Sequence, residues 1–305
     1  MAVTAALLLA SSSPALAQTI YIWEDENGVK HFTDRKPDTD RPVEMQRAVA
    51  EPEDLIALRR TGPDEAPVWL FRNRIHGPVA VRVSLAESDN VVSEPALPAV
   101  FVLEAQAERE LVTFGPLEPR RSWSYRLQTA SLPGQPDARH APDRPYRPPI
   151  APGSSYRIGQ AFGGEYSHSE ASGFHAVDIQ MPVGTPVHAA REGVVMDVAR
   201  HFHGTGDNPD RYGPRANFVR ILHDDGSMAV YAHLDYEGVL VRDGQHVRRG
   251  QRIGHSGNTG FSTGPHLHFV VQVNRDMNLT SVPFEFEGDD GQSVIPEPGQ
   301  VLVTD

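Results

Sequence analysis

The chain has 305 residues, enough for two or three domains, and its 39% hydrophobic and 22% charged content is typical of a folded protein. The net charge of -12 argues against a nucleic-acid partner, because a phosphate backbone requires a concentrated basic face. The absence of cysteine excludes disulfides, thiolate metal ligands and a cysteine nucleophile. The 26 glycines and 26 prolines favour a turn-rich, mostly β architecture.

Residues 1–17 are predicted to be a secretory signal peptide. The first 18 residues carry no charge, and an apolar run from Ala2 to Ala10 is followed by an Ala15-Leu16-Ala17 cleavage pattern. No basic segment precedes the run, which leaves the true translation start open. The run is too short to span a bilayer, so we expect no membrane span in the mature chain. These features predict a protein exported from a bacterium.

Residues 18–50 are predicted to form a small hairpin domain. Two β-prone runs, residues 20–23 and 29–32, flank a turn that contains Asn27-Gly28, which is a strong hairpin signal. The stretch resembles an N-terminal domain of unknown function that occurs in many exported Gram-negative proteins. The resemblance is carried by Tyr21, Trp23, Asp25, Gly28, Phe32 and Asp34.

Residues 51–135 are predicted to be a β-rich spacer domain. A polar, proline-bearing segment comes first, with one short helix expected from about Pro52 to Arg60. In VAVRVSL, residues 79–85, apolar side chains recur at every second position, which is the period of a half-buried strand. Together with VWLF, AVFVL, ELVTF and SWSYRLQT, this run predicts about five strands and a small sandwich. The proline-dense residues 136–153 are predicted to be an extended, semi-rigid linker.

Residues 154–305 are predicted to carry the chemistry, because 11 of the 14 histidines lie there. In the β-prone stretch HLHFVVQV, residues i and i+2 point to the same face of a strand. His266 and His268 should therefore lie side by side, with Leu267 turned into the core. Two such imidazoles can bind a metal, or one can bind it while the other acts on a substrate.

Three segments between residues 155 and 290 resemble the lysostaphin-type (LytM-like) zinc metallopeptidases of bacterial cell walls. The motifs are D-x-x-x-P-x-G-T-P-V from Asp178, YAHL from Tyr231, and STGPHLHF from Ser262, in that order. The resemblance implies a compact, mostly antiparallel β domain with a groove that binds an extended peptide. Overall, we therefore expect a mostly β chain with a C-terminal lysostaphin-like domain.

The resemblance also implies roles for individual residues. Asp178 and His268 would be zinc ligands, and His233 and His266 would be the catalytic pair. The third ligand has two candidates. The best-known members have a histidine four residues before the aspartate, where this chain has Phe174, and His175 lies one residue off that register. One branch of the family places the ligand in an upstream SH pair, and EYSHSEASGFHAVDI resembles that branch, which favours His168 over His175.

Two imidazoles and one carboxylate would hold one zinc ion and leave its fourth position open for water or substrate. The resemblance therefore implies a zinc metalloendopeptidase that uses a metal-activated water to hydrolyse peptidoglycan stem-peptide cross-links, specifically D-Ala–diaminopimelate bonds in a Gram-negative host. Its expected location is the periplasm or outer envelope. The alternative is an envelope regulator or peptidoglycan-binding protein, similar to amidase activators, with little or no catalysis. The presence of all the candidate ligand and catalytic residues favours the enzyme.

Overall fold

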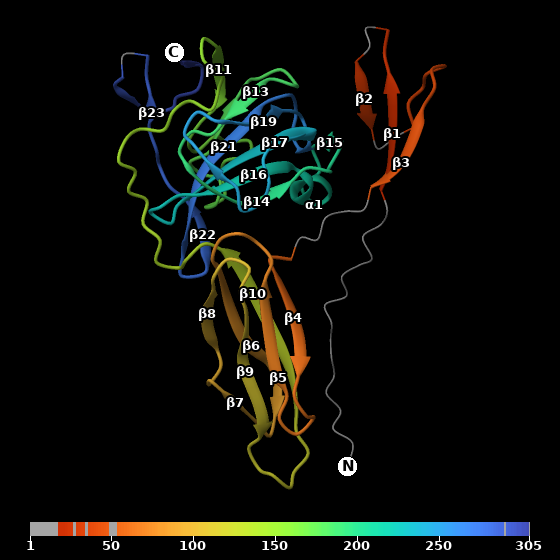
Figure 1. Cartoon of the computed structure of the whole chain (residues 1–305), viewed down its shortest axis with the longest axis vertical. Coiled ribbons are helices and arrows are strands. Elements are labelled where there is room, and N and C mark those ends of the chain that lie inside the picture. The colour runs from red at the N-terminus through yellow and green to blue at the C-terminus, as the bar shows by residue number, and fades with distance from the viewer. Residues whose placement is uncertain (1–17, 27–28, 34–35, 49–53, 290, 305) are drawn as a thin grey trace. The chain divides into compact units, whose positions relative to one another are not determined.

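The computed structural model describes residues 18–26, 29–33, 36–48, 54–289 and 291–304 (Figure 1). The predicted signal peptide lies outside these residues. Regular structure is nearly all β, as predicted; the only helical elements among the described residues are α1 (Pro209–Tyr212) and the 3-10 turn η1 (Gly213–Arg215). Neither of these short helices has the length or apolar character needed to cross a membrane.

The N-terminal described residues form a three-stranded antiparallel sheet, in the order β2-β1-β3. Strands β1 (Gln18–Glu24) and β2 (Lys30–Thr33) form the predicted hairpin, with Ile22 opposite Phe32. Strand β3 (Glu44–Ala48), which the sequence reading does not anticipate, pairs with the other edge of β1.

Residues 54–305 divide into two compact units, the first of which contains residues 54–138 and 274–279. Its two sheets have the orders β4-β5-β9-β7 and β10-β6-β8. They contact each other through the stacked rings of Phe114 and Tyr125, whose centroids lie 4.2 Å apart, and Trp69 donates a hydrogen bond to the Tyr125 hydroxyl. The predicted sandwich is therefore present. Its strands are β4 (Ile56–Thr61), β5 (Val68–Asn73), β6 (Val79–Asp89), β7 (Val91–Glu94), β8 (Ala99–Leu103), β9 (Glu108–Pro116) and β10 (Ser124–Pro133).

The prediction of a helix from about Pro52 to Arg60 is wrong for the residues that the structure describes. Ile56–Thr61 is strand β4, and it pairs antiparallel with β5 from Ile56 opposite Asn73 to Thr61 opposite Val68. Ile56 is buried in the sandwich core. Tertiary pairing overrides the local preference of a segment this short.

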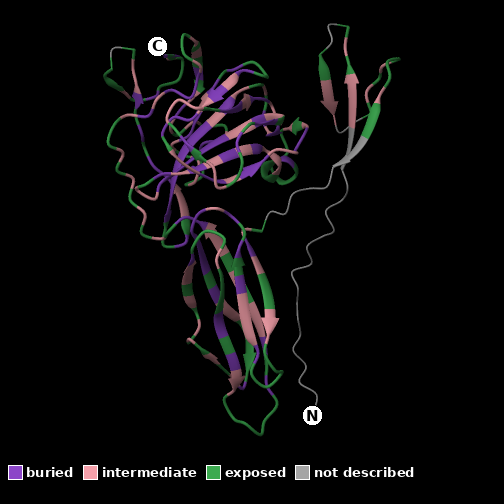
Figure 2. Cartoon of the chain, in the orientation of Figure 1, coloured by how far each residue is buried: buried purple, intermediate pink, exposed green. Residues whose placement is uncertain are grey.

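The second unit contains residues 139–273 and 280–305 and is built around one large sheet. The main path of this sheet is β18-β14-β16-β17-β21-β12-β11-β25, and β19 pairs with both β13 and β17. Its core side chains include Val219, Tyr231 and Phe269, which are fully buried. In Figure 2 much of this sheet is coloured as buried. The strands are β11 (Ser155–Gln160), β12 (Val177–Ile179), β13 (Pro186–His188), β14 (Gly193–Ala199), β15 (Thr205–Gly206), β16 (Asn217–Leu222), β17 (Met228–Val239), β18 (His246–Val247), β19 (Arg252–Ser256), β20 (Gly260–Phe261), β21 (Leu267–Arg275), β22 (Asn278–Ser281), β23 (Phe286–Glu287), β24 (Ser293–Val294) and β25 (Val301–Val303). The end of β21 and the start of β22 fall within residues 274–279, which belong to the first unit.

The proline-rich segment that the sequence reading assigns to a linker packs, from residue 139 onward, within the second unit. Tyr146 is 1% exposed and Ile150 is fully buried. The Tyr146 backbone N–H donates to the carbonyl of Glu285, and Ile150 forms an isolated β-bridge with Val187. Residues 139–153 therefore contribute to the core of this unit.

Candidate metal centre and catalytic histidines

Strand register brings Asp178 and His268 together. Asp178 of β12 lies directly opposite His268 of β21 in an antiparallel pair. Opposed residues share a face of the sheet, and their neighbours Leu267 and Ile179 turn to the other face, where both are fully buried. Leu267 and His268 therefore alternate as predicted, with His268 on the half-exposed face, whereas His266 lies immediately before β21.

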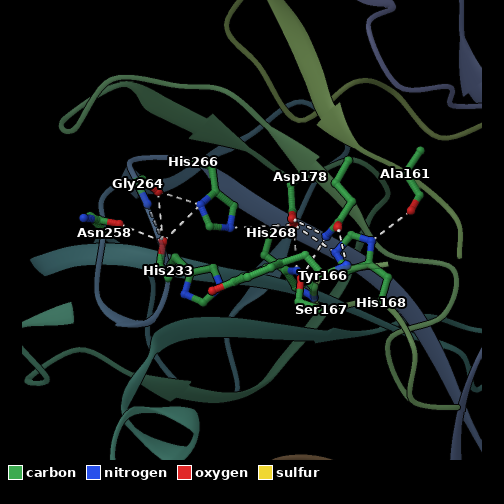
Figure 3. A network of polar contacts seen from close by, with 12 residues as sticks. Ala161, Tyr166, Ser167, His168, Asp178, His233, Asn258, Gly264, His266 and His268 are labelled. Carbon is green, nitrogen blue, oxygen red and sulfur yellow. Dashed lines mark hydrogen bonds and ion pairs between the residues drawn. The ribbon is translucent and has the colours of Figure 1, made fainter. Parts of the chain in front are cut away.

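Three side chains converge at this point: His168, Asp178 and His268. Their candidate ligand atoms all lie within 4.8 Å of one another. Asp178 Oδ1 lies 3.2 Å from His168 Nε2 and 2.9 Å from His268 Nδ1. Figure 3 shows the carboxylate reaching between the imidazole rings.

His168 lies in the loop between β11 and β12 and is completely buried. Its Nδ1–H donates to the carbonyl of Ala161 at 2.9 Å (Figure 3), and its own backbone N–H donates to the carbonyl of Gly164. Because a carbonyl can only accept, Nδ1 carries a proton; Nε2, which can donate to Asp178 while the ring is protonated, is the nitrogen that can bind a metal once that proton is lost.

The carboxylate and the imidazoles influence each other's protonation. Burial alone would raise the pKa of Asp178, but hydrogen bonds from His168 and His268 outweigh it and hold the pKa below its usual value. For His168, burial favours a lower pKa, but the hydrogen bond and the negative charge of Asp178 raise it overall. Asp178 is therefore ionised at neutral pH, as a metal ligand must be.

The donor set fits zinc. Tetrahedral zinc with bonds of about 2.0–2.1 Å holds its ligand atoms about 3.3 Å apart. The separations of 3.2 and 2.9 Å from Asp178 Oδ1 are close to that value. Two imidazoles and a carboxylate form one of the known sets for catalytic zinc.

His266 and His233 lie beside this cluster, with ring centroids 4.6 Å apart (Figure 3). His266 Nδ1 donates to the carbonyl of Gly264 at 2.8 Å, and His233 Nδ1 donates to the carbonyl of Thr259 at 2.7 Å. Each neutral ring therefore keeps Nε2 as a proton acceptor. The Nε2 atom of His266 is 3.7 Å from Asp178 Oδ1, which places it next to the candidate metal position.

Burial keeps both of these imidazoles neutral. Burial lowers the pKa of His233 to about 3. Burial also lowers the pKa of His266, although the charge of Asp178 opposes the effect.

A β-bulge in β17 determines the direction of the His233 side chain. Ala232 of β17 lies opposite Phe218 of β16, and Leu234 lies opposite the next residue, Asn217, so His233 is the extra residue. Its φ of 60° is in the left-handed region, which is uncommon for a residue other than glycine. A residue held in this conformation carries a strain energy on the order of 1–3 kcal/mol, and residues of this kind are concentrated at functional sites.

The structure does not bring His175, the other candidate for the third ligand, into the cluster. Its Nδ1 lies 3.1 Å from the Ser281 carbonyl oxygen, and its ring packs edge-on against Phe162 and Phe174. Gln160, which is absent from the predicted site residues, also contacts Asp178 through its side chain. Only the pairing of β11 with β12 reveals that contact, and no sequence motif marks it.

Comparison with known proteins identifies two regions of the chain. Residues 173–279 match Peptidase family M23, and residues 6–56 match a domain of unknown function, DUF4124. The M23 match includes Asp178, His233, His266 and His268, whereas His168 lies before its start.

Individual relatives match parts of the chain. Peptidoglycan DD-endopeptidase ShyA of Vibrio cholerae is 39% identical over 123 residues, which cover 39% of this chain and 26% of the relative. Lysostaphin of Staphylococcus simulans is 35% identical over 153 residues, which cover 48% of this chain and 28% of the relative. The chain thus spans little more than a quarter of the length of these relatives. The solved catalytic domain of Staphylococcus simulans lysostaphin is 33% identical, and that match covers 41% of this chain and 88% of that one, with a TM-score of 0.32. Residues 173–279 are therefore similar to peptidase family M23, and residues 6–56 are similar to the DUF4124 domain.

Proposed function

We propose that this protein is a zinc-dependent endopeptidase that hydrolyses peptide cross-links of bacterial peptidoglycan. The observation that carries the proposal is the convergence of His168, Asp178 and His268 beside two neutral imidazoles within an M23 domain. Relatives of this domain are named peptidoglycan DD-endopeptidase and lysostaphin. The proposed bond is D-Ala–diaminopimelate, in agreement with the DD-endopeptidase relative. The proposed location is the periplasm or outer envelope, which the predicted signal peptide and the DUF4124 domain support.

Three residues would hold the zinc ion in this proposal: His168 through Nε2, Asp178 through Oδ1 and His268 through Nδ1. When bound, zinc supplies Lewis-acid chemistry, lowering the pKa of water towards neutrality and polarising a carbonyl group. The Ala161 carbonyl fixes the tautomer of His168 and so keeps Nε2 aimed at the ion.

His233 and His266 would manage the protons of the reaction. Each ring donates Nδ1–H to a backbone carbonyl and leaves Nε2 as an acceptor. Either Nε2 can take the proton that the attacking water loses, and the imidazolium formed can then donate to the developing oxyanion or to the leaving amine. The chain contains no H-E-x-x-H motif, so the glutamate base of that motif is missing and a histidine takes its place.

The proposal is tested by incubating the mature protein with purified peptidoglycan before chelation, after chelation and after zinc is restored. We expect soluble, uncrosslinked peptides with zinc, none after chelation, and recovery when zinc returns. A zinc-loaded protein that binds peptidoglycan but releases nothing would refute the enzyme and favour the regulator.

A further inference from the structure

Gln160, the last residue of β11, lies directly opposite Asp178 of β12. Ile158 of β11 lies opposite Ile179, so an unbroken register would place Gly159 opposite Asp178. The register shifts between Ile158 and Gln160, which makes Gly159 the extra residue of a bulge and turns Gln160 to the face that carries the carboxylate. Gln160, Asp178 and His268 therefore form one row across β11, β12 and β21.

The amide of Gln160 makes three polar contacts. Its Nε2 donates to Asp178 Oδ2 at 3.1 Å and to Ser167 Oγ at 2.8 Å. Its Oε1 accepts from the backbone N–H of Tyr166 at 3.3 Å. The reversed amide would place its oxygen against the carboxylate, so the network fixes the orientation. The amide thus ties Asp178 to the two residues that immediately precede His168.

The two oxygens of Asp178 consequently have different partners. Oδ2 accepts from Gln160, whereas Oδ1 lies between His168 Nε2 and His268 Nδ1. A carboxylate held in this way presents one oxygen to a metal. Without the amide the carboxylate could rotate and offer both oxygens, and the loop that carries His168 would lose its tie to the strand.

We propose that Gln160 is a positioning residue that makes Asp178 a one-oxygen zinc ligand and sets the loop carrying His168. The inference rests on the metal site of the proposed function and adds a residue outside the ligand set. Partners of this kind typically contribute 10–100-fold to metal affinity.

Gly164 supports the inference independently. A Cβ at this position would overlap Gln160 Cγ and Cδ, so only glycine leaves the amide where it is. The Gly164 N–H donates to the carbonyl of Ala161, the same carbonyl that accepts from His168 Nδ1. Gln160, Gly164 and the ligand histidine are thus packed as one unit.

The test compares Gln160→Met, which keeps the side-chain length but lacks the amide, with Gly164→Ala, which displaces an intact Gln160. Gln180→Met is the matched control, because Gln180 is an exposed glutamine two residues after Asp178 and makes none of the three contacts described for Gln160. Zinc affinity of the full chain is measured by competition with a chromophoric chelator. We expect roughly 10–100-fold weaker zinc binding for Gln160→Met and Gly164→Ala, and wild-type binding for the control.

A second readout reports the geometry of the site. Cobalt(II) loaded in place of zinc should absorb more weakly in Gln160→Met than in the wild type, because two-oxygen binding by Asp178 raises the coordination number. Wild-type affinity and spectrum in both folded variants would overturn the inference. Loss of the native circular dichroism spectrum in both variants would also overturn it, because a positioning role predicts an intact fold. If the wild type binds zinc and the variants bind it weakly, the inference stands even when no peptidoglycan is cleaved, so the two proposals fail separately.

Discussion

Backbone carbonyls around the site decide which nitrogen of each histidine is available. Ala161, Thr259 and Gly264 accept from Nδ1 of His168, His233 and His266, respectively, and leave Nε2 free. His268 differs, because its Nδ1 faces Asp178. The sequence motifs predict which histidines lie close together. The carbonyls that orient these histidines belong to turns, and only the folded structure shows that these turns lie next to the histidine rings.

The choice between His168 and His175 gives the first prediction. His168→Ala should abolish stoichiometric zinc binding, because it removes a buried ligand atom 3.2 Å from Asp178 Oδ1. His175→Ala should retain one zinc per chain, because its ring is held by Ser281 and aromatic neighbours. Metal content after dialysis checks both variants. Zinc retained by His168→Ala and lost by His175→Ala would reverse the assignment.

The bulge at His233 gives the second prediction. Asparagine tolerates left-handed backbone, so His233→Asn should fold and bind zinc normally. Loss of the proton acceptor should lower the rate of peptidoglycan cleavage about 10²–10⁴-fold. His233→Ala should be equally inactive and about 1 kcal/mol less stable than His233→Asn in urea unfolding. Cleavage by His233→Asn at the wild-type rate would exclude His233 from the reaction.

At the scale of elements, alternation of apolar residues predicted strands, but it could not predict where pairing breaks. The run at residues 79–85 lies in β6, and all of HLHFVVQV except His266 lies in β21. The bulges at Gly159 and His233 depend on neighbouring strands far away in the sequence, so no local pattern marks them. The same reason explains β4, where pairing with β5 replaced the predicted helix.

Asn217, the first residue of β16, gives the third prediction. It is fully buried, its Oδ1 accepts from the Phe202 N–H, and its Nδ2 donates to the carbonyls of Phe202 and Asp235. Asn217→Ala should lower the free energy of unfolding by about 3 kcal/mol, because it leaves buried backbone groups unpaired. The control is Asn208→Ala, which removes only the exposed cap of α1 and should cost at most about 1 kcal/mol. Equal urea midpoints for the two variants would contradict the role assigned to Asn217.

His223, at the turn between β16 and β17, gives the fourth prediction. Its Nδ1 donates to the carbonyl of Glu192, and its buried Nε2 has no hydrogen-bond partner among the described residues. Burial lowers its pKa to about 4; Arg191 reinforces the effect, and Asp225 and Glu192 oppose it. The folded state therefore resists protonation, whereas the unfolded state takes up a proton near pH 6.5.

The low pKa of His223 therefore leaves the folded state at full stability above about pH 6.5. As the pH falls towards 4, protonation of His223 in the unfolded state lowers the free energy of unfolding by up to about 3 kcal/mol. His223→Asn keeps a donor near Nδ1 and does not titrate. The difference in unfolding free energy between wild type and variant should therefore shrink, or change in favour of the variant, between pH 7 and pH 4. A difference that is constant over this range would contradict a depressed pKa.

For the molecule as a whole, the boundary of the unit that contains the candidate metal site gives the fifth prediction. A fragment of residues 139–305 keeps Tyr146 and Ile150, which are 1% and 0% exposed, whereas a fragment of residues 154–305 loses both. Each buried side chain of this size contributes about 1.5–3 kcal/mol, so the shorter fragment should be about 4 kcal/mol less stable. Thermal unfolding checks this, and equal melting temperatures would place residues 139–153 outside the core.

The reaction proposed for the whole protein can be tested on a defined substrate. A purified, cross-linked muropeptide dimer with a D-Ala–diaminopimelate bond is incubated with the zinc-loaded protein, and the products are weighed by mass spectrometry. We expect two monomers whose masses sum to that of the dimer plus one water, one ending in D-Ala and the other carrying a free diaminopimelate amine. An intact dimer, or cleavage at a different bond, would contradict the proposed reaction.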